Sequence, residues 1–307
     1  MASVLLAQAA KLTQNQLVSG VIENIYTTNQ FYEIMPFAGI QGNALAYNRE
    51  LALGDVQLAG VGTQITAKTA ATFTQVSSSL TTIIGDAEVN GLLQSTYSDR
   101  TDQTAVQIAS KAKSVGRTYQ DYLITGDSNT TNEFDGLLNL AAAGQTVSAT
   151  ATDGDQLDFE KLDEIISLVK DKDGQVDYIM MNDRSHRKVY SLLRSLGGAG
   201  VNDVVTLPSG KTVLQYRNIP IFINDYIPIT QTQGGSSDAT TIIAGTVDDG
   251  SMTVGLSGLT SANDFGVQVV DVGEDPDYDN HIWRVKFYAG LALFNENGLA
   301  IATGIIP

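Results

Sequence analysis

The sequence has 307 residues, of which 43% are hydrophobic, so it can bury a substantial core and is long enough for about two domains. It contains no cysteine, which excludes disulfides, thiolate metal sites and cysteine nucleophiles. The 34 acidic residues outnumber the 18 basic ones, and the formal net charge of −16 repels phosphate, which argues against sequence-specific binding of DNA or RNA.

Residues 1–14, MASVLLAQAAKLTQ, lack the charged start and the long apolar run of a secretory signal. No stretch reaches the ~18 apolar residues that cross a bilayer. We therefore expect a protein without a membrane segment that stays in a cytoplasm-like compartment. Apolar residues at helical spacing between residues 4 and 30, followed by Pro36, predict a short amphipathic helix within an N-terminal arm.

A polar β-hairpin is predicted next. Residues 47–62, YNRELALGDVQLAGVG, predict a strand and a glycine-rich tip, and residues 63–77, TQITAKTAATFTQVS, predict the returning strand. Strand alternation places these residues on one face: Leu45, Tyr47, Arg49, Leu51 and Leu53. Arms of about 11 residues would extend roughly 35 Å. Because an isolated two-stranded hairpin is marginal in water, we expect this one to pack on another chain.

A long helix is the clearest single element. Residues 77–94, SSSLTTIIGDAEVNGLLQ, predict a turn and a short apolar segment before it. The helix itself is expected from about Asp99 to about Thr125, capped by Ser98 or Asp99 and roughly 40 Å long. Its expected apolar stripe is Ala105, Ile108, Ala109, Ala112, Val115, Tyr119, Tyr122 and Leu123. Gly126 should end it, and a domain boundary is expected near residues 141–156.

The rest of the chain mixes both element types. Helices are predicted at about 158–171 and 183–196, on either side of a strand at 176–181, VDYIMM. Further strands are predicted at 218–229, 240–247, 251–256, 265–272 and 281–294. The fold class predicted from these runs is α+β.

The sequence offers little for catalysis. His186 lies one turn after Asp183 near a helix start, but no nucleophile signature accompanies the pair, so a surface histidine is the better interpretation. His281 alternates with Ile282 as an ordinary strand residue would. The motifs of P-loops, dinucleotide-binding folds, serine hydrolases and zinc proteases are absent from the sequence. We therefore predict no enzyme activity, no catalytic residue and no cofactor.

An acidic run at residues 271–280, DVGEDPDYDN, is superficially similar to a calcium loop, with Asp275, Asp277 and Asp279 at alternate positions. The match fails at Asn280, where glycine is required, and at Lys286, where a bidentate glutamate should stand. A solvated acidic turn is the preferred interpretation, and a weak divalent-ion site at a subunit contact stays open. The run DKDGQVD at 171–177 is a weaker case.

The order of these elements resembles the major capsid protein of tailed bacteriophages, a fold shared with encapsulin shells and the floor domain of herpesvirus capsids. The similar stretches are GVIENIYTTNQFYEIMPFAGIQGNALAYNRE at 20–50, YQDYLITGDSNTTNEFDGLL at 119–138, NIPIFINDYIP at 218–228 and IIAGTVDDGSMTVGL at 242–256. By this resemblance residues 1–41 would be an N-terminal arm and 42–84 an extended loop. Residues 85–145 with 266–307 would be a peripheral domain containing a spine helix, and 146–265 an axial domain.

The resemblance implies a structural protein that assembles through pentamers and hexamers into an icosahedral shell around double-stranded DNA, without sequence-specific binding. Its location would be the virion, after assembly in the host cytoplasm. Its partners would be other copies of the chain, portal and scaffolding proteins and, as an option left open, cement proteins. Because the hairpin starts by Asn43, we expect either a mature chain or a separate scaffolding protein. The alternatives are an encapsulin-type nanocompartment and an acidic calcium-dependent binding protein.

The hairpin would supply the contacts between subunits. Leu51, Leu53 and Leu58 are expected to cover a neighbouring chain, while Arg49, Glu50 and Asp55 form ion pairs across the contact. In another branch of the family the shell is covalently cross-linked through a hairpin lysine, and Lys68 is the only lysine of the predicted hairpin. Because it lies in the returning strand and not at the tip, noncovalent clamping is preferred to a cross-link at Lys68.

Overall fold

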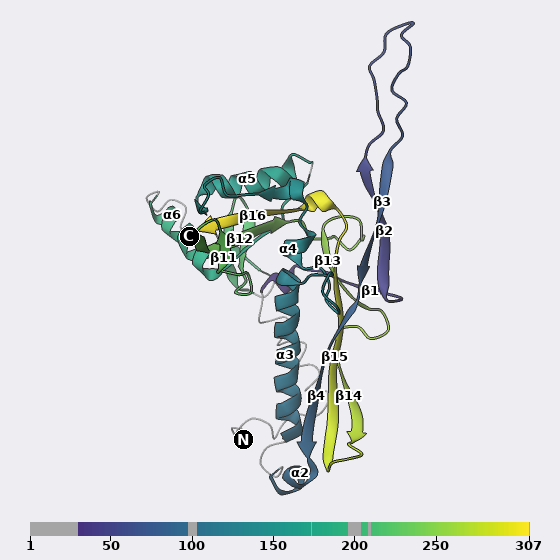
Figure 1. Ribbon diagram of the computed structural model, residues 1–307, viewed down its shortest axis with the longest axis vertical. Helices are drawn as coiled ribbons and strands as arrows, with labels where there is room; N and C mark the ends of the chain where they lie inside the picture. The colour runs from purple at the N-terminus through teal and green to yellow at the C-terminus, as the bar shows by residue number, and fades with distance from the viewer. Residues whose placement is uncertain (1–29, 98–102, 173, 196–203, 208–209, 307) are drawn as a thin grey trace.

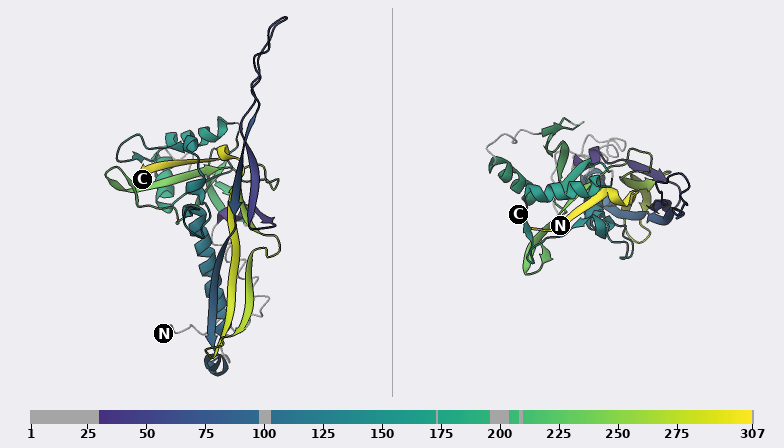
Figure 2. Two further views of the ribbon diagram at one scale, coloured as in Figure 1. Left: turned by 45° about the vertical axis from the view of Figure 1, so that its right-hand side comes forward. Right: turned by 90° about the horizontal axis from the view of Figure 1, so that it is seen from above.

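The computed structural model describes residues 30–97, 103–172, 174–195, 204–207 and 210–306, and these form an elongated molecule with three parts (Figure 1). The first, called here the limb, contains the long helix α3 and the strands beside it. The second, the wing, is a nine-stranded sheet with helices α5 and α6. The third, the hairpin, is residues 44–79, and its far end projects beyond the other two parts in Figure 1 and in the left view of Figure 2.

The limb is built on a five-stranded sheet of order β1-β13-β15-β14, with β4 also paired to β15. Its strands are β1 (Phe37–Ile40), β4 (Thr81–Asn90), β13 (Leu256–Ser261), β14 (Val267–Glu274) and β15 (Asn280–Leu293). Its helices are η2 (Gln30–Glu33), α2 (Gly91–Tyr97), α3 (Gln103–Thr125) and α4 (Leu137–Leu140). Helix α3 packs along β4 and β15 for most of its length (Figure 1).

The predicted long helix is confirmed from Gln103 to Thr125, whereas its expected cap at Ser98 or Asp99 lies outside the described residues. The stripe of Ala105, Ile108, Ala112 and Val115 is buried, and the opposite face is exposed. Small side chains on this stripe allow the helix to approach the sheet closely.

The prediction of a turn with a short apolar segment after residue 77 is wrong, because residues 81–90 form the ten-residue strand β4. Ala87 and Val89 are buried towards α3, and Glu88 between them is exposed. At Gly85 an added Cβ would lie 3.6 Å from the Lys111 side chain, so this position faces α3, and two of the positions on that face, Gly85 and Ala87, are small. Small inward residues give a strand a weak alternating pattern, which is why the sequence did not reveal it.

The wing has strand order β5-β16-β12-β7-β10-β9-β8, with β6 paired to β16 and β11 to β12. The strands are β5 (Thr146–Val147), β6 (Asp155–Gln156), β7 (Tyr178–Met181), β8 (Val204–Thr206), β9 (Thr212–Tyr216), β10 (Ile219–Ile223), β11 (Gln231–Gln233), β12 (Ser236–Gly245) and β16 (Leu299–Ile306). The helices are η3 (Ala143–Gln145), α5 (Phe159–Lys170), α6 (Asp183–Ser195) and η4 (Glu296–Gly298). The predicted helices at 158–171 and 183–196 are therefore confirmed.

Helices α5 and α6 cover one face of the wing sheet. Leu162, Ile166 and Val169 of α5 and Val189 of α6 share one apolar cluster with strand residues such as Ile179. The opposite face belongs to the limb's core, where the ring of Phe31 lies 4.7 Å from that of Tyr178 and 5.9 Å from that of Phe222. This second core joins the wing and the limb into one body.

The strand predicted at 251–256 is a loop up to Gly255, in which the Asp248 carboxylate accepts hydrogen bonds from the backbone N–H groups of Gly250, Met252 and Val254. Strands β9 and β16 were not predicted individually. The amphipathic helix expected between residues 4 and 30 lies outside the described residues. None of the helices in the described part of the chain is both long and apolar enough to cross a membrane.

Candidate functional site: the extended hairpin

The hairpin consists of β2 (Ala44–Ala52) and β3 (Thr72–Ser79), paired in antiparallel register with Tyr47 opposite Val76 and Arg49 opposite Thr74. Between Glu50 and Ala52 the register shifts, so Leu51 forms a β-bulge. A bulge adds one residue to one strand, and the alternation predicted through Leu53 therefore holds only as far as Glu50. The expectation that Leu51 and Leu53 simply continue the face of Arg49 is corrected by this bulge.

Residues 53–71, called here the distal hairpin, run side by side without a regular ladder (Figure 1). Gln57 joins the two arms instead. Its side-chain oxygen accepts hydrogen bonds from the backbone N–H groups of Thr66 (2.7 Å) and Ala67 (2.9 Å), and its amide donates to the carbonyl of Gln64 (3.0 Å). At the tip, Thr63 N–H donates to the carbonyl of Gly60, and Gly62 has a φ of 81°. That positive φ is the reason for glycine at the third position of this turn.

The distal hairpin and the bulged Leu51 just before it expose apolar side chains that nothing in the described part of the chain covers. The exposed fraction is 68% for Leu51 and 78% for Leu53, and Leu58 is fully exposed. Val56 and Val61 are exposed to the same degree as Leu58. A row of large apolar side chains held away from the core is typical of a surface that becomes buried on association.

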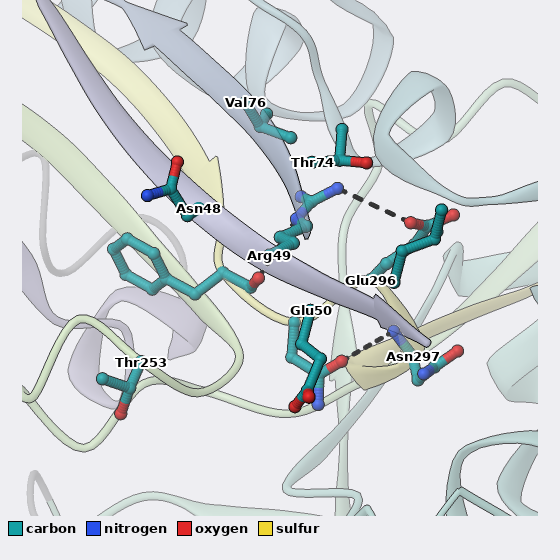
Figure 3. A pocket seen from close by; sticks show the side chains of 11 residues that line it. Asn48, Arg49, Glu50, Thr74, Val76, Thr253, Glu296 and Asn297 are labelled. Carbon is teal, nitrogen blue, oxygen red and sulfur yellow. Dashed lines mark hydrogen bonds and ion pairs between the residues drawn. The ribbon is translucent and has the colours of Figure 1, made fainter. Parts of the chain in front are cut away.

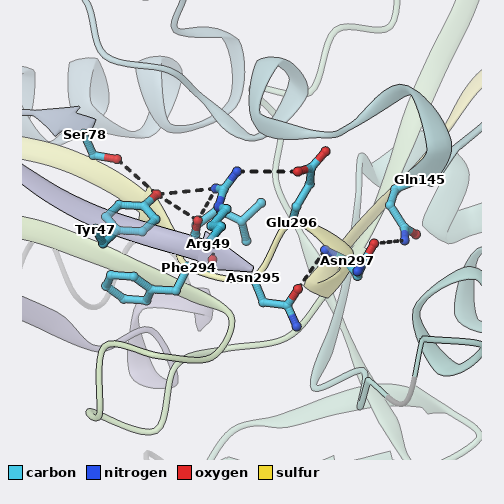
Figure 4. Close-up of polar contacts among 9 residues, drawn as sticks. Tyr47, Arg49, Ser78, Gln145, Phe294, Asn295, Glu296 and Asn297 are labelled. Carbon is cyan, nitrogen blue, oxygen red and sulfur yellow. Dashed lines mark hydrogen bonds and ion pairs between the residues drawn. The ribbon is translucent and has the colours of Figure 1, made fainter. Parts of the chain in front are cut away.

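Two side chains anchor the base of the hairpin to the end of β15 (Figure 4). The Tyr47 hydroxyl donates to the carbonyl of Leu293 at 2.9 Å, and its ring meets that of Phe294 edge-on at 5.1 Å. Arg49 Nε donates to the carbonyl of Phe294 at 3.1 Å, and its Nη2 donates to that of Leu293. Arg49 Nη1 also lies 3.7 Å from the Glu296 carboxylate. Charge-assisted donors on two carbonyls hold the base in one orientation.

Packing supports this anchor. Leu45 and Tyr47 rest on a small cluster that contains Ile40, Leu259 and Phe294. Beside the anchor lies an open groove of about 540 Å³, bordered by β2, β3 and η4 and lined in part by Arg49, Glu50 and Glu296 (Figure 3). The base of the hairpin is therefore fixed to the limb, whereas the distal hairpin has no packing partner in the described part of the chain.

The structure divides the predicted contact residues into two groups. Glu50, Leu51, Leu53, Asp55 and Leu58 are exposed on the hairpin, as is the candidate cross-link residue Lys68. The Asp55 carboxylate accepts a hydrogen bond from the Thr69 hydroxyl at 2.6 Å. Arg49, in contrast, is held within its own chain, with a side chain only 18% exposed. That any of these residues contacts a neighbouring subunit stays a prediction.

Sequence reasoning missed the roles of Gln57 and of the anchor. A glutamine between hydrophobic neighbours in a glycine-rich tip was the available signal for Gln57. Arg49 and Tyr47 sit 244 and 246 residues from their acceptor at Leu293, and no local pattern indicates such a pairing.

The two histidines lie in unremarkable surroundings. Burial lowers the pKa of His186, whose ring meets that of Tyr190 edge-on. His281 Nε2 lies 2.7 Å from Asp271 Oδ1 across the β14–β15 pair. The acidic run joins these two strands as a turn, in which Asp275 accepts from the Asp277 N–H. Among the described residues, no three His, Asp or Glu side chains converge as a metal site would require.

No protein-family model and no curated protein sequence matches this chain. Solved structures do. The chain is similar to the structure of the holo-SrpI encapsulin complex from Synechococcus elongatus PCC 7942, with a TM-score of 0.70, 17% identity, and 99% of this chain and 92% of that chain covered. It is also similar to the capsid of the native GTA particle, with a TM-score of 0.65, 9% identity, and 100% and 96% of the two chains covered. For the capsid of Myoviridae phage XM1 the TM-score is 0.61 at 14% identity, with 89% and 90% covered.

These likenesses extend over nearly the entire chain and include capsid and encapsulin subunits alike. The chain therefore has the fold of tailed-phage major capsid proteins, shared with encapsulins, and the predicted α+β class and fold are confirmed.

Proposed function

We propose that this protein is a structural shell subunit, a major capsid protein that assembles through pentamers and hexamers into an icosahedral shell enclosing double-stranded DNA. The observation that carries the proposal is the distal hairpin, which projects from a well-packed body with its apolar side chains uncovered. The capsid fold over the full chain supports it.

Assembly follows from the physics of many weak contacts. Each copy would bury Leu51, Leu53 and Leu58 on a neighbour, with each contact modest by itself. In a closed shell every subunit makes several such contacts at once, so dissociation of one contact leaves the others in place. The anchor at Tyr47 and Arg49 reduces the freedom that the arm loses on docking, which favours association.

The chemistry of the chain supports a container more than an enzyme. The sequence holds no recognised motif that combines a nucleophile, a base and an orienting acid, and the net charge of −16 would keep a shell lining from binding packaged DNA tightly. The proposed partners are other copies of this chain, together with portal, scaffolding and cement proteins in a virion. Noncovalent clamping by the hairpin is preferred to a cross-link through Lys68.

Replacing the distal hairpin tests this function directly. A variant in which an Asn-Gly turn substitutes for residues 53–71 keeps Ala52 opposite Thr72, as in the register of the intact chain. We expect a folded subunit with an unchanged thermal midpoint that forms no stable shells by negative-stain microscopy and size-exclusion chromatography. Normal shells from this variant, or no particles from the intact chain under any condition, would contradict the proposal.

An encapsulin-type compartment is the second candidate, favoured by the similarity to the SrpI encapsulin structure over 99% of this chain. The contents of purified particles separate the two functions. Nuclease-protected double-stranded DNA supports the capsid, and a single enclosed enzyme supports the compartment. The calcium-binding alternative has no observation in its favour, because Asp271 is engaged by His281 and Asp275 by its own turn.

A further inference from the structure

Helix α6 carries an unusual concentration of positive charge for so acidic a chain. Its sequence, DRSHRKVYSLLRS, holds four of the 18 basic residues of the protein: Arg184, Arg187, Lys188 and Arg194. Spacings of three, four and seven place them on one side of the helix, opposite the buried Val189. Figure 1 shows α6 at the end of the wing farthest from the hairpin.

Part of this basic face is not neutralised within the chain. Arg184 donates to the carbonyls of Ile229 and Asp238, so it is used inside the wing. Arg187 pairs with Asp183 at 3.1 Å. Lys188 and Arg194 form no ion pair with any carboxylate of the described residues. The exposed Arg194 and the partly buried Lys188 therefore have no counter-charge in the part of the chain that the structure describes.

The wing also carries the opposite charge in a second place. Residues 153–164, DGDQLDFEKLDE, contain six acids and one lysine and lead into the first turns of α5. Backbone N–H groups of Thr150 and Ala151 hold the pKa of Asp155 at about 2, so it stays ionised. Lys161 lies 3.3 Å from Asp155 and 3.2 Å from Glu164, and Arg217 lies 2.9 Å from Asp163. Glu160 is exposed and has no ion pair with a described cation.

Copies with a net charge of −16 repel one another, so electrostatics favour an approach between them only where a positive surface meets a negative one. We propose that the basic face of α6 in one copy docks on the acidic segment 153–164 of a second copy, in a head-to-tail contact between wings. This inference rests on the proposed function, because it names the neighbour as another subunit. A head-to-tail contact uses two different surfaces of the same domain and closes into rings when the rotation is suitable.

Charge reversal on each side tests the pairing. K188E/R194E removes the unpaired cations of α6, and E160K/E164K reverses two exposed acids of α5. Each variant alone should assemble about tenfold more slowly at low salt, since complementary charges accelerate encounters by at least that factor. The matched control K113E/R117E makes the same charge change as the first variant on the exposed side of α3 and should assemble at nearly the normal rate.

Combining the two sets of charge reversals provides the decisive measurement. A chain with all four reversals should recover the rate of self-association of the intact chain, and a mixture of the two double variants should associate faster than either variant alone. Sedimentation velocity detects this pairing between two or a few subunits, so it is read without any complete shell. Thermal melts verify that each variant is folded.

Three results would overturn the proposal. The first is normal assembly of K188E/R194E. The second is a control as slow as that variant, which would mean general repulsion. The third is failure of the mixture to associate, combined with lost binding of a labelled DNA duplex by K188E/R194E, which would assign the face to nucleic acid. If the intact chain forms no shells but the mixed double variants still associate, the proposed shell function is contradicted and the proposed contact between α6 and residues 153–164 is not.

Discussion

The wing and the distal hairpin solve the problem of burying apolar side chains in opposite ways. In the wing, Ile166 and Ile179 are fully buried and lie within one apolar cluster shared by two helices and a sheet. In the distal hairpin, Leu53 and Leu58 are exposed, and the two arms are joined mainly through the side chain of Gln57 and the Asp55–Thr69 pair. The wing is stable within one chain, whereas the hairpin is complete only when another surface covers it.

The anchor formed by Tyr47 and Arg49 marks the boundary between the packed part of the hairpin and its uncovered part. On its near side, Leu45 and Tyr47 pack on Phe294 and Leu259, and on its far side the ladder ends at a bulge. A flexible arm would lose more conformational entropy on docking, and a packed arm would have no apolar surface left for a partner. The combination of a fixed base and an uncovered arm therefore suits repeated, reversible association.

The largest predicted effect contrasts one core residue with one hairpin residue. Ile166→Ala should lower the free energy of unfolding of the subunit by about 2–5 kcal/mol, because it leaves a cavity between α5 and the sheet. Leu58→Ala should change the same quantity by less than about 0.5 kcal/mol, because the side chain is already in water. Urea denaturation of unassembled subunits measures both.

The effects of the two variants on shell stability should be in the opposite order to their effects on subunit stability. At a temperature where both are folded, Leu58→Ala should weaken shells more than Ile166→Ala does. The contrast fails if Leu58→Ala destabilises the isolated subunit as strongly as the core variant, since the hairpin would then pack on its own chain.

Sequence predicted the regular elements better than their connections. The helices α3, α5 and α6 carry long apolar stripes, and their bounds were found to within a few residues. The hairpin was visible because a glycine-rich tip separates two polar strands. Strand β4 was missed because the positions facing α3 include Gly85 and Ala87, which add little to an alternating pattern.

The candidate site was predictable as an element and not as a set of contacts. Exposure of Leu51, Leu53 and Leu58 follows from a strand pair with nothing to bury it. The inward role of Arg49 depends on carbonyls at the end of β15, and only the folded topology brings these together. The same limit hides the pairing of Gln57 with Thr66, because a glutamine between hydrophobic neighbours does not indicate which residue of the other arm it bonds.

An intermediate effect is expected at the anchor. Arg49→Ala removes charge-assisted hydrogen bonds to the carbonyls of Leu293 and Phe294 and should lower the local stability of the hairpin base by about 1.5–3 kcal/mol. Hydrogen exchange of the backbone amides in β2 and β3 should quicken, while exchange in the wing should not change.

The control for the anchor is Glu296→Gln, which removes only a partly exposed ion pair and should cost less than about 1 kcal/mol. Arg49→Lys keeps the charge and loses the forked geometry, so it should fall between the two. If Arg49→Ala leaves exchange in β2 and β3 unaltered, the hairpin is mounted by Tyr47 and apolar packing alone.

The smallest effect concerns the distal hairpin itself. Gln57→Ala should speed exchange of the Thr66 and Ala67 amides by roughly fivefold, the factor that corresponds to about 1 kcal/mol, without shifting the global unfolding midpoint. Gln64→Ala is the matched control, since Gln64 accepts the hydrogen bond from Gln57 only through its backbone carbonyl. Because a looser arm loses more entropy on docking, Gln57→Ala should also slow assembly, whereas Gln64→Ala should not. Equal exchange rates in the two variants would mean that the two arms are held together without the hydrogen bonds of the Gln57 side chain.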